Sequence, residues 1–473
     1  MRNKFKTQEE LVNHLKTVGF VFANSEIYNG LANAWDYGPL GVLLKNNLKN
    51  LWWKEFVTKQ KDVVGLDSAI ILNPLVWKAS GHLDNFSDPL IDCKNCKARY
   101  RADKLIESFD ENIHIAENSS NEEFAKVLND YEISCPTCKQ FNWTEIRHFN
   151  LMFKTYQGVI EDAKNVVYLR PETAQGIFVN FKNVQRSMRL HLPFGIAQIG
   201  KSFRNEITPG NFIFRTREFE QMEIEFFLKE ESAYDIFDKY LNQIENWLVS
   251  ACGLSLNNLR KHEHPKEELS HYSKKTIDFE YNFLHGFSEL YGIAYRTNYD
   301  LSVHMNLSKK DLTYFDEQTK EKYVPHVIEP SVGVERLLYA ILTEATFIEK
   351  LENDDERILM DLKYDLAPYK IAVMPLVNKL KDKAEEIYGK ILDLNISATF
   401  DNSGSIGKRY RRQDAIGTIY CLTIDFDSLD DQQDPSFTIR ERNSMAQKRI
   451  KLSELPLYLN QKAHEDFQRQ CQK

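Results

Sequence analysis

The stretch Gln198-Ile-Gly-Lys-Ser-Phe-Arg-Asn-Glu206, which continues through Thr208-Pro-Gly210 to Phe214-Arg-Thr-Arg-Glu-Phe-Glu-Gln-Met-Glu223, decides how this chain of 473 residues is organised. Two runs of strand-like character, 197–206 and 214–227, flank a Thr-Pro-Gly-Asn break. Turn residues between two such runs predict a β-hairpin.

The side chains of this hairpin have the chemistry of a nucleotide site. Because side chains alternate along a strand, we expect Arg204 and Glu206 to share a face, and Phe219, Gln221 and Glu223 to share one on the returning strand. A guanidinium binds phosphate, a carboxylate accepts from an exocyclic amine, and a ring stacks on a base. The alternative is a solvated hairpin of mixed charge, which the Arg-x-Glu spacing and the returning Arg-Glu-Phe-Glu disfavour.

Length and composition indicate a globular protein of two or three domains. Hydrophobic residues make up 42% of the chain and charged residues 27%, and the formal net charge is −8, so any nucleic-acid contact must use local basic patches. The first ten residues are too charged for a signal peptide and no apolar run approaches the length of a membrane span. We therefore expect a cytoplasmic protein, in which seven cysteines do not form a disulfide framework.

Four of the cysteines form two Cys-x-x-Cys pairs, Cys93-Lys-Asn-Cys96 and Cys135-Pro-Thr-Cys138, separated by 38 residues. Two thiolates on a tight turn supply two corners of a tetrahedron, so the pairs together predict a four-cysteine zinc site. Pairs that are vestigial, or redox-active without metal, are the alternatives. The polar, acidic segment 111–130 between them indicates an inserted subdomain at about 93–148.

An apolar stripe follows the Gly-Pro turn at 38–39, with Leu44, Leu48, Leu51 and Trp52 at helical spacing. Such a stripe is usually core, and a subunit interface is the alternative.

Three further positions carry candidate chemistry. Glu172 follows a strand and either lines a pocket or complements a helix N-terminus. Glu289 is a carboxylate in an apolar strand, where it would bind Mg²⁺ held by phosphates or pair with a buried Arg. Near residue 331 a strand runs into Pro-Ser-x-Gly, and the following helix has Arg336 in its first turn, where an anion or a flat base can approach.

The charged break at 353–368 is the predicted domain boundary, and beyond it strands and helices alternate as in a compact α/β domain whose last strand is 437–441. A helix at 405–414 carries the basic residues Lys408, Arg409, Arg411 and Arg412, with Arg440 and Arg442 further on. Such a cluster is usually a solvated face, but in a net-acidic chain it is the best nucleic-acid patch.

Taken together, these motifs resemble those of the class II aminoacyl-tRNA synthetases. The hairpin is similar to motif 2, Ser331-Val-Gly-Val-Glu-Arg336 to motif 3, and the Gly-Pro turn with its helix to the motif 1 region that forms the dimer interface. Arg170-Pro-Glu-Thr-Ala-Gln-Gly176, Thr208-Pro-Gly210, 328–331 and 405–414 resemble the single-chain glycyl-tRNA synthetases, and the resemblance covers nearly the whole chain. Ser331 stands where other class II members often have Gly, which suits a small pocket.

The resemblance implies an α+β protein whose class II catalytic domain, an antiparallel sheet flanked by helices, occupies residues 1–360 and carries the Cys-pair insertion. A C-terminal α/β anticodon-binding domain would occupy 367–473. The enzyme would activate glycine with ATP to glycyl-adenylate and pyrophosphate and transfer glycine to the 3′ end of its tRNA. Its partners would be glycine, tRNA and a second copy of the chain, with Mg²⁺ and a structural Zn²⁺.

The resemblance also assigns residues. Arg204 would hold the α-phosphate, Glu206 the adenine amine and Arg215 the outer phosphates, with adenine stacked between Phe219 and Arg336. The implied ATP-binding set is Arg204, Asn205, Glu206, Phe214, Arg215, Thr216, Arg217, Glu218, Phe219, Glu289, Leu290, Gly333, Val334, Glu335 and Arg336, with Glu289 near Mg²⁺. The implied glycine-binding set is Arg101, Glu172, Phe219, Glu220, Gln221, Met222, Glu223, Glu329, Pro330, Ser331, Val332 and Gly333.

Two other functions remain open at this point. A class II synthetase for another small amino acid would share the hairpin and the C-terminal domain. A synthetase-like paralogue that only binds RNA or regulates is the other, and it would not need Arg204, Glu206, Phe219 and Arg336.

Overall fold

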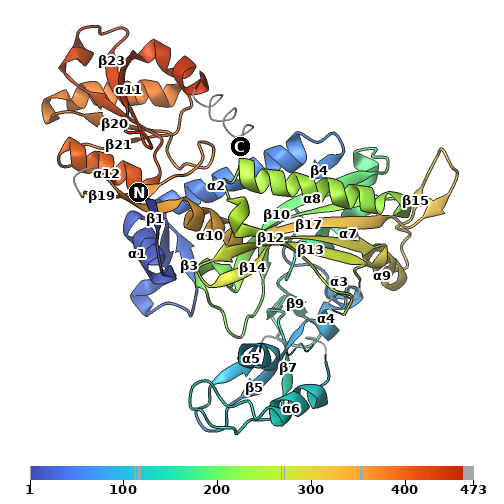
Figure 1. Cartoon of the computed structure of the whole chain (residues 1–473). Helices are drawn as coiled ribbons and strands as arrows, with labels where there is room; N and C mark the ends of the chain where they lie inside the picture. The colour runs from blue at the N-terminus through green and yellow to red at the C-terminus, as the bar shows by residue number, and fades with distance from the viewer. Residues whose placement is uncertain are drawn as a thin grey trace.

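The computed structural model describes residues 2–110, 113, 115, 119–267, 269–270, 272–351 and 355–461. Its core is an α+β unit built on a seven-stranded sheet of order β12-β13-β14-β17-β11-β10-β4. The insertion that contains β5 and the C-terminal unit that contains β20 extend from this core in different directions (Figure 1). None of the helices described is both long enough and apolar enough to span a bilayer.

Neighbouring strands of the large sheet are antiparallel, except that β10 and β4 are parallel. The register places Gln198 of β10 opposite Glu223 of β11, and Glu223 opposite Ser331 of β17. In sheet order the strands are β12 (Leu259–Glu263), β13 (Lys275–Phe283), β14 (Gly286–Thr297), β17 (His326–Gly333), β11 (Glu218–Leu228), β10 (Phe194–Phe203) and β4 (Val63–Gly65).

Two layers of helices cover the sheet. Side chains alternate along β11, so Met222, Ile224 and Phe226 enter the main core, to which α2 (Pro39–Trp53), α8 (Ala233–Ser250) and α10 (Val334–Ala345) contribute. Phe227, on the opposite face, enters a second core with α7 (Ala174–Ser187) and α9 (Tyr299–Ser308). Glu223 and Glu225 of β11 therefore lie on the face that α7 and α9 cover, whereas Glu218 and Glu220 lie on the other face.

Helix α2 packs into the core of its own chain through the predicted stripe. Leu44, Leu48 and Trp52 are buried, which confirms the core interpretation for these three positions. Pro39 is the first helical residue, a position where its missing N–H is not needed. Gly41 is required by a close approach, because a Cβ there would lie 2.0 Å from the carbonyl oxygen of Phe20.

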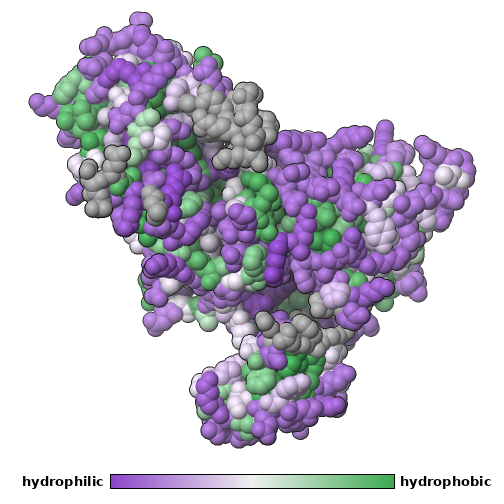
Figure 2. Space-filling model, viewed as in Figure 1, coloured by the Kyte–Doolittle hydropathy of each residue, from purple (hydrophilic) through white to green (hydrophobic). Residues whose placement is uncertain are grey.

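The insertion is a small sheet of order β6-β5-β7 with two helices packed beside it. Figure 2 shows a hydrophobic patch on this part of the molecule, on a face that is otherwise mostly hydrophilic. Residues 111, 112, 114 and 116–118 of the predicted acidic segment lie outside the described residues. The elements are β5 (Ser87–Asp92), β6 (Arg99–Arg101), α5 (Ala102–Phe109), α6 (Asn121–Asp130) and β7 (Arg147–Asn150).

The C-terminal unit has a five-stranded sheet of order β21-β20-β22-β23-β24, in which β20 is parallel to β21 and β22 while β23 and β24 are antiparallel. The prediction that the last strand is 437–441 is wrong, because β24 follows and pairs with it. Residues 462–473 of the predicted domain lie outside the described residues. The elements are β20 (Ile371–Pro375), α11 (Lys381–Asp393), β21 (Ala398–Phe400), α12 (Ile406–Ile416), β22 (Tyr420–Ile424), β23 (Ser436–Glu441) and β24 (Gln447–Lys451).

Between the core and this unit lies a three-stranded sheet of order β1-β18-β19, in which the N-terminal strand pairs with residues near 350. Residues 352–354 of the predicted break lie outside the described residues. The strands are β1 (Arg2–Lys4), β18 (Thr346–Lys350) and β19 (Glu356–Met360). The remaining elements are α1 (Gln8–Val18), β2 (Val21–Ala23), β3 (Trp35–Tyr37), α3 (Pro74–Ala79), α4 (His82–Asn85), β8 (Lys154–Tyr156), β9 (Val166–Tyr168), β15 (Tyr314–Phe315) and β16 (Lys322–Tyr323).

Candidate active site

The predicted hairpin is present as β10 and β11, but β10 ends at Phe203 and β11 begins at Glu218, so the connection between them is longer than predicted. The ladder ends at the pair Phe203–Glu218, so Arg204 and Glu206 lie in the connecting loop and not on a strand face. The N-terminal segment holds this loop in place, because the Asn33 side-chain amide donates to the carbonyls of Phe212 at 2.7 Å and Arg215 at 2.9 Å. The strand prediction failed here because these partners come from distant parts of the chain.

Arg204 is positioned at the start of this loop by aromatic rings. Its guanidinium carbon lies 5.3 Å from the ring centre of Phe219 and 5.5 Å from that of Phe86, and its Nε donates to the carbonyl of Pro171 at 3.2 Å. Arg217 ties the two sides of the loop together, since its Nε donates to the Glu206 carbonyl at 3.1 Å. The predicted pairing of a guanidinium and an aromatic ring on this hairpin is thus present.

Arg336 begins a second cluster at the N-terminus of α10. Its guanidinium lies 4.4 Å from the ring centre of Phe214 and forms a 2.9 Å ion pair with Glu289 of β14. Arg336 and burial act in opposite directions on Glu289, and the Arg336 charge prevails and lowers the pKa of that carboxyl. Of the two alternatives for Glu289, the Arg partner is the one present here, although the Glu289 side chain remains 55% exposed and accessible to a cation.

Glu223 is the centre of a buried polar group on the same face of β11. One of its carboxylate oxygens accepts from Ser331 Oγ at 2.7 Å and from Gln221 Nε2 at 2.9 Å. The other accepts from the backbone N–H of Thr173 at 3.1 Å and from its hydroxyl. All four donors are neutral, so among the described residues no cation lies at ion-pair distance from Glu223. Burial and the neighbouring Glu172 raise the pKa of this carboxyl, which the more distant Arg296 offsets only in part.

Glu329 lies on β17 next to this group and does have a cation. Its two oxygens accept from Nη1 of Arg296 at 3.0 and 2.9 Å, while Nε and Nη2 of Arg296 donate to Asp300 at 2.9 Å each. Burial, opposed by Arg296 and reinforced by Glu223, raises the pKa of Glu329 to about 8. One guanidinium therefore serves two carboxylates at the base of the pocket.

Glu172 completes the set from the loop before α7. It accepts from Gln175 Nε2 at 2.8 Å, and His82 Nε2 lies 3.6 Å away. Burial raises the pKa of Glu172, but the nearby His82 and Arg296 outweigh it and the pKa is lowered overall. Burial lowers the pKa of His82. Glu172 lies beside this carboxyl cluster and also directly before the N-cap of α7, so both roles predicted for it stay open.

The sequence reasoning missed one member of this face, Glu225. It is fully buried, and neither of its oxygens has a hydrogen-bond partner among the described residues. Burial and the neighbouring Glu329 raise its pKa well above the usual range of a carboxyl. The alternation that selected Phe219 and Glu223 continues to Glu225, so the pattern could have found it, whereas Arg296 and Asp300 have no local signal.

Several predicted residues have side chains that lie away from this pocket. Met222 and Val332 are buried in the main core on the opposite face of the sheet, and Glu220 on that face forms ion pairs with Lys45 and Lys49. Pro330 lies between Glu329 and Ser331 on β17, so it is on the opposite face from them, and it is buried too. In the ATP-binding set, Leu290 and Val334 are core residues and Glu335 is paired with Lys45.

The structure places Arg101 in the insertion with its charge balanced there. Its guanidinium forms ion pairs with Asp88 at 3.1 Å and Asp103 at 2.6 Å. The expected reach of Arg101 toward glycine is therefore absent from this arrangement, because two buried carboxylates hold the side chain in the small sheet.

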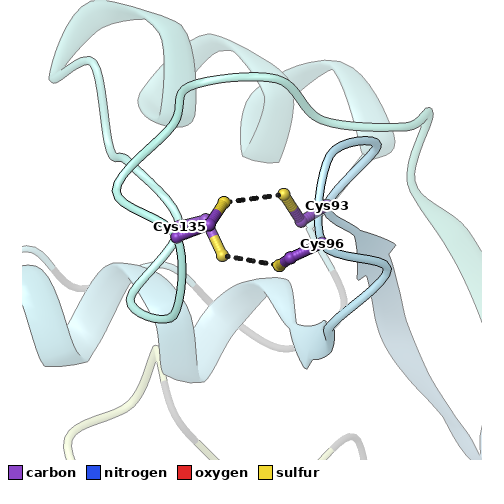
Figure 3. A group of neighbouring side chains, drawn as sticks. Cys93, Cys96 and Cys135 are labelled. Atoms are coloured by element: carbon purple, nitrogen blue, oxygen red, sulfur yellow. Dashed lines mark hydrogen bonds between the residues drawn. The ribbon is translucent and has the colours of Figure 1, made fainter.

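The four cysteines come together in the insertion (Figure 3). Their Sγ atoms all lie within 4.8 Å of one another, with Cys93 and Cys138 3.5 Å apart and Cys96 and Cys135 3.6 Å apart. A tetrahedral zinc with Zn–S bonds of about 2.3 Å has sulfur–sulfur edges of about 3.8 Å. The donor set and spacing therefore fit a zinc ion.

The basic cluster of the C-terminal unit is only partly a surface. Arg409 is buried and donates to the carbonyl of Pro375 at 2.6 Å, so the prediction of an exposed Arg409 is wrong. Arg440 and Arg442 are buried as well, in ion pairs with Asp414 and Asp361. Arg409 and Arg440 donate to carbonyl and carboxylate groups inside the unit, and Arg442 donates to Asp361 and Leu362 just before it, so their charges are satisfied without solvent.

On α12, the helix that carries Arg409, Lys408 and Arg412 are exposed and Arg411 is half-buried. Arg412 pairs with Asp401, and Arg411 pairs with Asp355. Three of the four predicted basic residues on α12 thus remain accessible to a polyanion.

The sequence matches three family models. They are described as tRNA synthetase class II core domain (G, H, P, S and T), over residues 153–345; anticodon binding domain, over 370–462; and glycyl-tRNA synthetase insertion domain 1, over 88–124. The first and second matches bear out the predicted fold class.

Curated relatives match over nearly the whole chain. The sequence is 90% identical to the glycine–tRNA ligase of Ureaplasma parvum serovar 3 over 473 residues, which is all of both chains. It is 61% identical to the glycine–tRNA ligase of Malacoplasma penetrans, covering 95% of this chain and 96% of that one. A solved prolyl-tRNA synthetase from Cryptosporidium parvum, in complex with L-proline and AMP, is similar in fold with a TM-score of 0.62 at 12% identity, covering 97% of this chain and 76% of that chain.

Proposed function

The chain belongs to the glycine–tRNA ligase family of class II aminoacyl-tRNA synthetases, and we propose that it binds its substrates on the face of β11 and β17 that carries Glu223 and Ser331. It activates glycine with ATP and charges its tRNA. What the proposal adds is the assignment of residues to each part of this reaction.

The observation that carries the glycine site is a buried cluster in which, among the described residues, carboxyl groups outnumber the cations paired with them. Glu223 receives only neutral donors and Glu172 has only His82 within ion-pair distance, while Arg296 is shared between Glu329 and Asp300. Buried carboxylates in excess of cations are costly unless a cation joins them. The ammonium group of glycine supplies that cation through charge-assisted hydrogen bonds.

Glycine offers no side chain to bind, so selectivity must come from denying room to a Cβ. A methyl group is worth only about 1–3 kcal/mol in a permissive pocket, hence exclusion has to be steric. The neighbours of Glu223 favour this, since Ser331, Gln221 and Thr173 all hydrogen-bond to it and surround it closely.

On the nucleotide side, we assign Arg204 to the α-phosphate, Glu206 to the adenine amine and Arg215 to the outer phosphates. Adenine would stack between Phe219 and Arg336. The glycine carboxylate attacks the α-phosphorus in line and pyrophosphate leaves. A hydroxyl of the terminal adenosine of tRNA then attacks the glycyl carbonyl, and AMP leaves as the glycyl ester forms. Catalysis then needs no protein nucleophile, only positioning and charge stabilisation.

Two metal ions belong to the proposal. Glu289 would contribute to binding Mg²⁺, which supplies positive charge at the phosphates. The four-cysteine cluster would hold a structural Zn²⁺ that closes the insertion.

We further propose that the part of the chain from residue 367 onward binds the anticodon region of tRNA, with Lys408, Arg411 and Arg412 of α12 as phosphate contacts. Residues 1–360 would form the catalytic domain, with the Cys-pair insertion at about 93–148. The match to an anticodon binding domain supports the first assignment.

The active enzyme would be a homodimer that works in the cytoplasm, where tRNA charging serves protein synthesis. Support for a dimer comes from the segment before α2, which exposes apolar side chains that a single chain leaves in water: Ile27 is 87% exposed, Tyr28 81% and Leu31 70%.

The test is amino-acid-dependent ATP–pyrophosphate exchange with glycine, alanine, serine, threonine and proline. We expect exchange with glycine alone, and loss of exchange in Arg204→Ala with an unchanged circular dichroism spectrum. Preference for another amino acid would refute the pocket assignment, and near-normal exchange in Arg204→Ala would refute the role of that residue. Binding of tRNA without any exchange would favour an RNA-binding paralogue.

A further inference from the structure

A buried lysine connects helix α2 to both halves of the nucleotide site. Nζ of Lys45 lies 2.6 Å from a carboxylate oxygen of Glu220 and 2.6 Å from one of Glu335. The three side chains are 7%, 13% and 6% exposed. The Tyr37 ring also packs on the ammonium group, 4.2 Å from ring centre to Nζ.

The two carboxylates belong to the segments that carry the proposed adenine contacts. Glu220 follows Phe219 on β11, and Glu335 precedes Arg336 in the first turn of α10. The second oxygen of Glu335 accepts from the backbone N–H of Glu220 at 2.8 Å. Glu335 therefore holds the strand and Lys45 at once, and the three elements α2, β11 and α10 share one junction.

The alternation of side chains along β11 explains how this junction on one face of the sheet influences the Phe219 ring on the other face. Glu220 and Phe219 point to opposite sides of β11, so fixing Glu220 on one side fixes where the backbone presents the Phe219 ring on the other. In the same way, Glu335 determines where the first turn of α10 presents Arg336.

A contribution to stability does not by itself explain why Lys45, Glu220 and Glu335 are buried together. A buried ion pair is often no better for stability than well-packed apolar side chains of the same size, whereas its geometry is demanding. Although burial lowers it, the neighbouring Glu335 and Glu220 carboxylates raise the pKa of Lys45, so the ammonium stays charged and keeps both partners.

We propose that Lys45 is a positioning residue for ATP, which sets the spacing of Phe219 and Arg336 from a helix that itself does not touch the nucleotide. The proposal rests on the proposed function, because it takes these two side chains as the contacts of adenine. A misplacement of about 1 Å in a catalytic arrangement lowers rates by up to about 100-fold.

The test measures steady-state ATP–pyrophosphate exchange with each substrate varied in turn. For Lys45→Met we expect kcat/KM for ATP to fall roughly 10- to 100-fold while KM for glycine stays within about twofold. Lys45→Arg, which keeps the charge, should recover part of the loss. Lys201→Met is the matched control, because it removes a lysine that pairs with Glu218 on the exposed end of the same sheet, and it should match the unaltered enzyme.

A triple variant, Lys45→Met with Glu220→Gln and Glu335→Gln, separates positioning from folding. We expect it to regain the melting temperature that Lys45→Met loses, without regaining kcat/KM for ATP. Recovery of both, or an unaltered kcat/KM for ATP in folded Lys45→Met, would overturn the inference. Arg336→Ala separates the proposed role of Arg336 from the inference about Lys45. If this variant leaves KM for ATP unchanged, the proposed role of Arg336 fails. If it raises KM for ATP while Lys45→Met does not, only the inference about Lys45 fails.

Discussion

Replacing Glu223 with Gln removes a charge from the proposed ammonium site while keeping its shape. The carboxylate accepts from Gln221 and Ser331 through one oxygen and twice from Thr173 through the other. An amide has one oxygen, so its NH₂ group would face either the Thr173 donors or the Gln221 and Ser331 donors. The variant thus loses the negative charge and also leaves a pair of donors without an acceptor.

The size of the effect follows from the lost interaction with the ammonium group. A hydrogen bond to a charged group contributes about 1.5–3 kcal/mol. At about 1.4 kcal/mol for each factor of ten, KM for glycine should rise about 10- to 150-fold. KM for ATP should stay within about twofold, because the proposed nucleotide contacts are on the loop after β10, at the start of β11 and on α10, and none of them hydrogen-bonds Glu223 among the described residues.

The assay is ATP–pyrophosphate exchange with glycine varied at saturating ATP, and then with ATP varied at saturating glycine. Glu245→Gln is the control, because this residue lies on α8 outside both substrate sets, and its side chain is 35% exposed and pairs with Lys261. A KM for glycine within twofold of the unaltered enzyme would refute the assignment of Glu223. So would a matched loss for both substrates together with a lower melting temperature, which would indicate a folding role.

Three other perturbations test the structure away from this residue. Asp414→Asn leaves the buried Arg440 guanidinium without its carboxylate, now 2.8 Å away, and leaves Arg357 with Glu349 as its carboxylate partner. It should lower the free energy of unfolding of the unit by about 3–5 kcal/mol in urea, and a loss below about 1 kcal/mol, typical of surface pairs, would contradict it. Burial and Glu329 raise the pKa of Glu225, so the folded chain keeps a proton that the unfolded chain releases above about pH 4.3, and stability falls as pH rises. The melting temperature of Glu225→Gln relative to the unaltered protein should therefore increase from about pH 5 to pH 8, and parallel curves would disprove this. Cys135→Ser should reduce zinc in the purified protein, by elemental analysis, from about one per chain to well below one, and an unchanged content would refute the zinc assignment.

Local patterns in the sequence predicted most of the framework. The β10–β11 hairpin, the buried stripe of α2 and the passage from β17 into α10 were all readable, because each depends on periodicity or turn residues within one segment. The ends of β10 and β11 were not readable. They depend on Asn33, about 170 residues away, which holds the loop.

Charge partners were the other part that the sequence could not supply. A run of basic residues looks the same whether it faces solvent or not, so Arg101 and Arg409 were assigned to ligands although they serve the insertion and the C-terminal unit. Arg296 and Asp300 went unnoticed for the converse reason. Nothing near them in the sequence marks a pair whose importance comes from Glu329 on another strand.

The sequence by itself determined the family, the alternation along β11 and hence which of its side chains share a face. Period-two alternation is a property of any extended strand, so it needs no partner to be read. Only the tertiary structure decided which carboxylates are balanced and which are not. It brings Arg296 to Glu329, Lys45 to Glu220 and neutral donors to Glu223. Glu223 is therefore the carboxyl group of this hairpin with which an ammonium ion would pair.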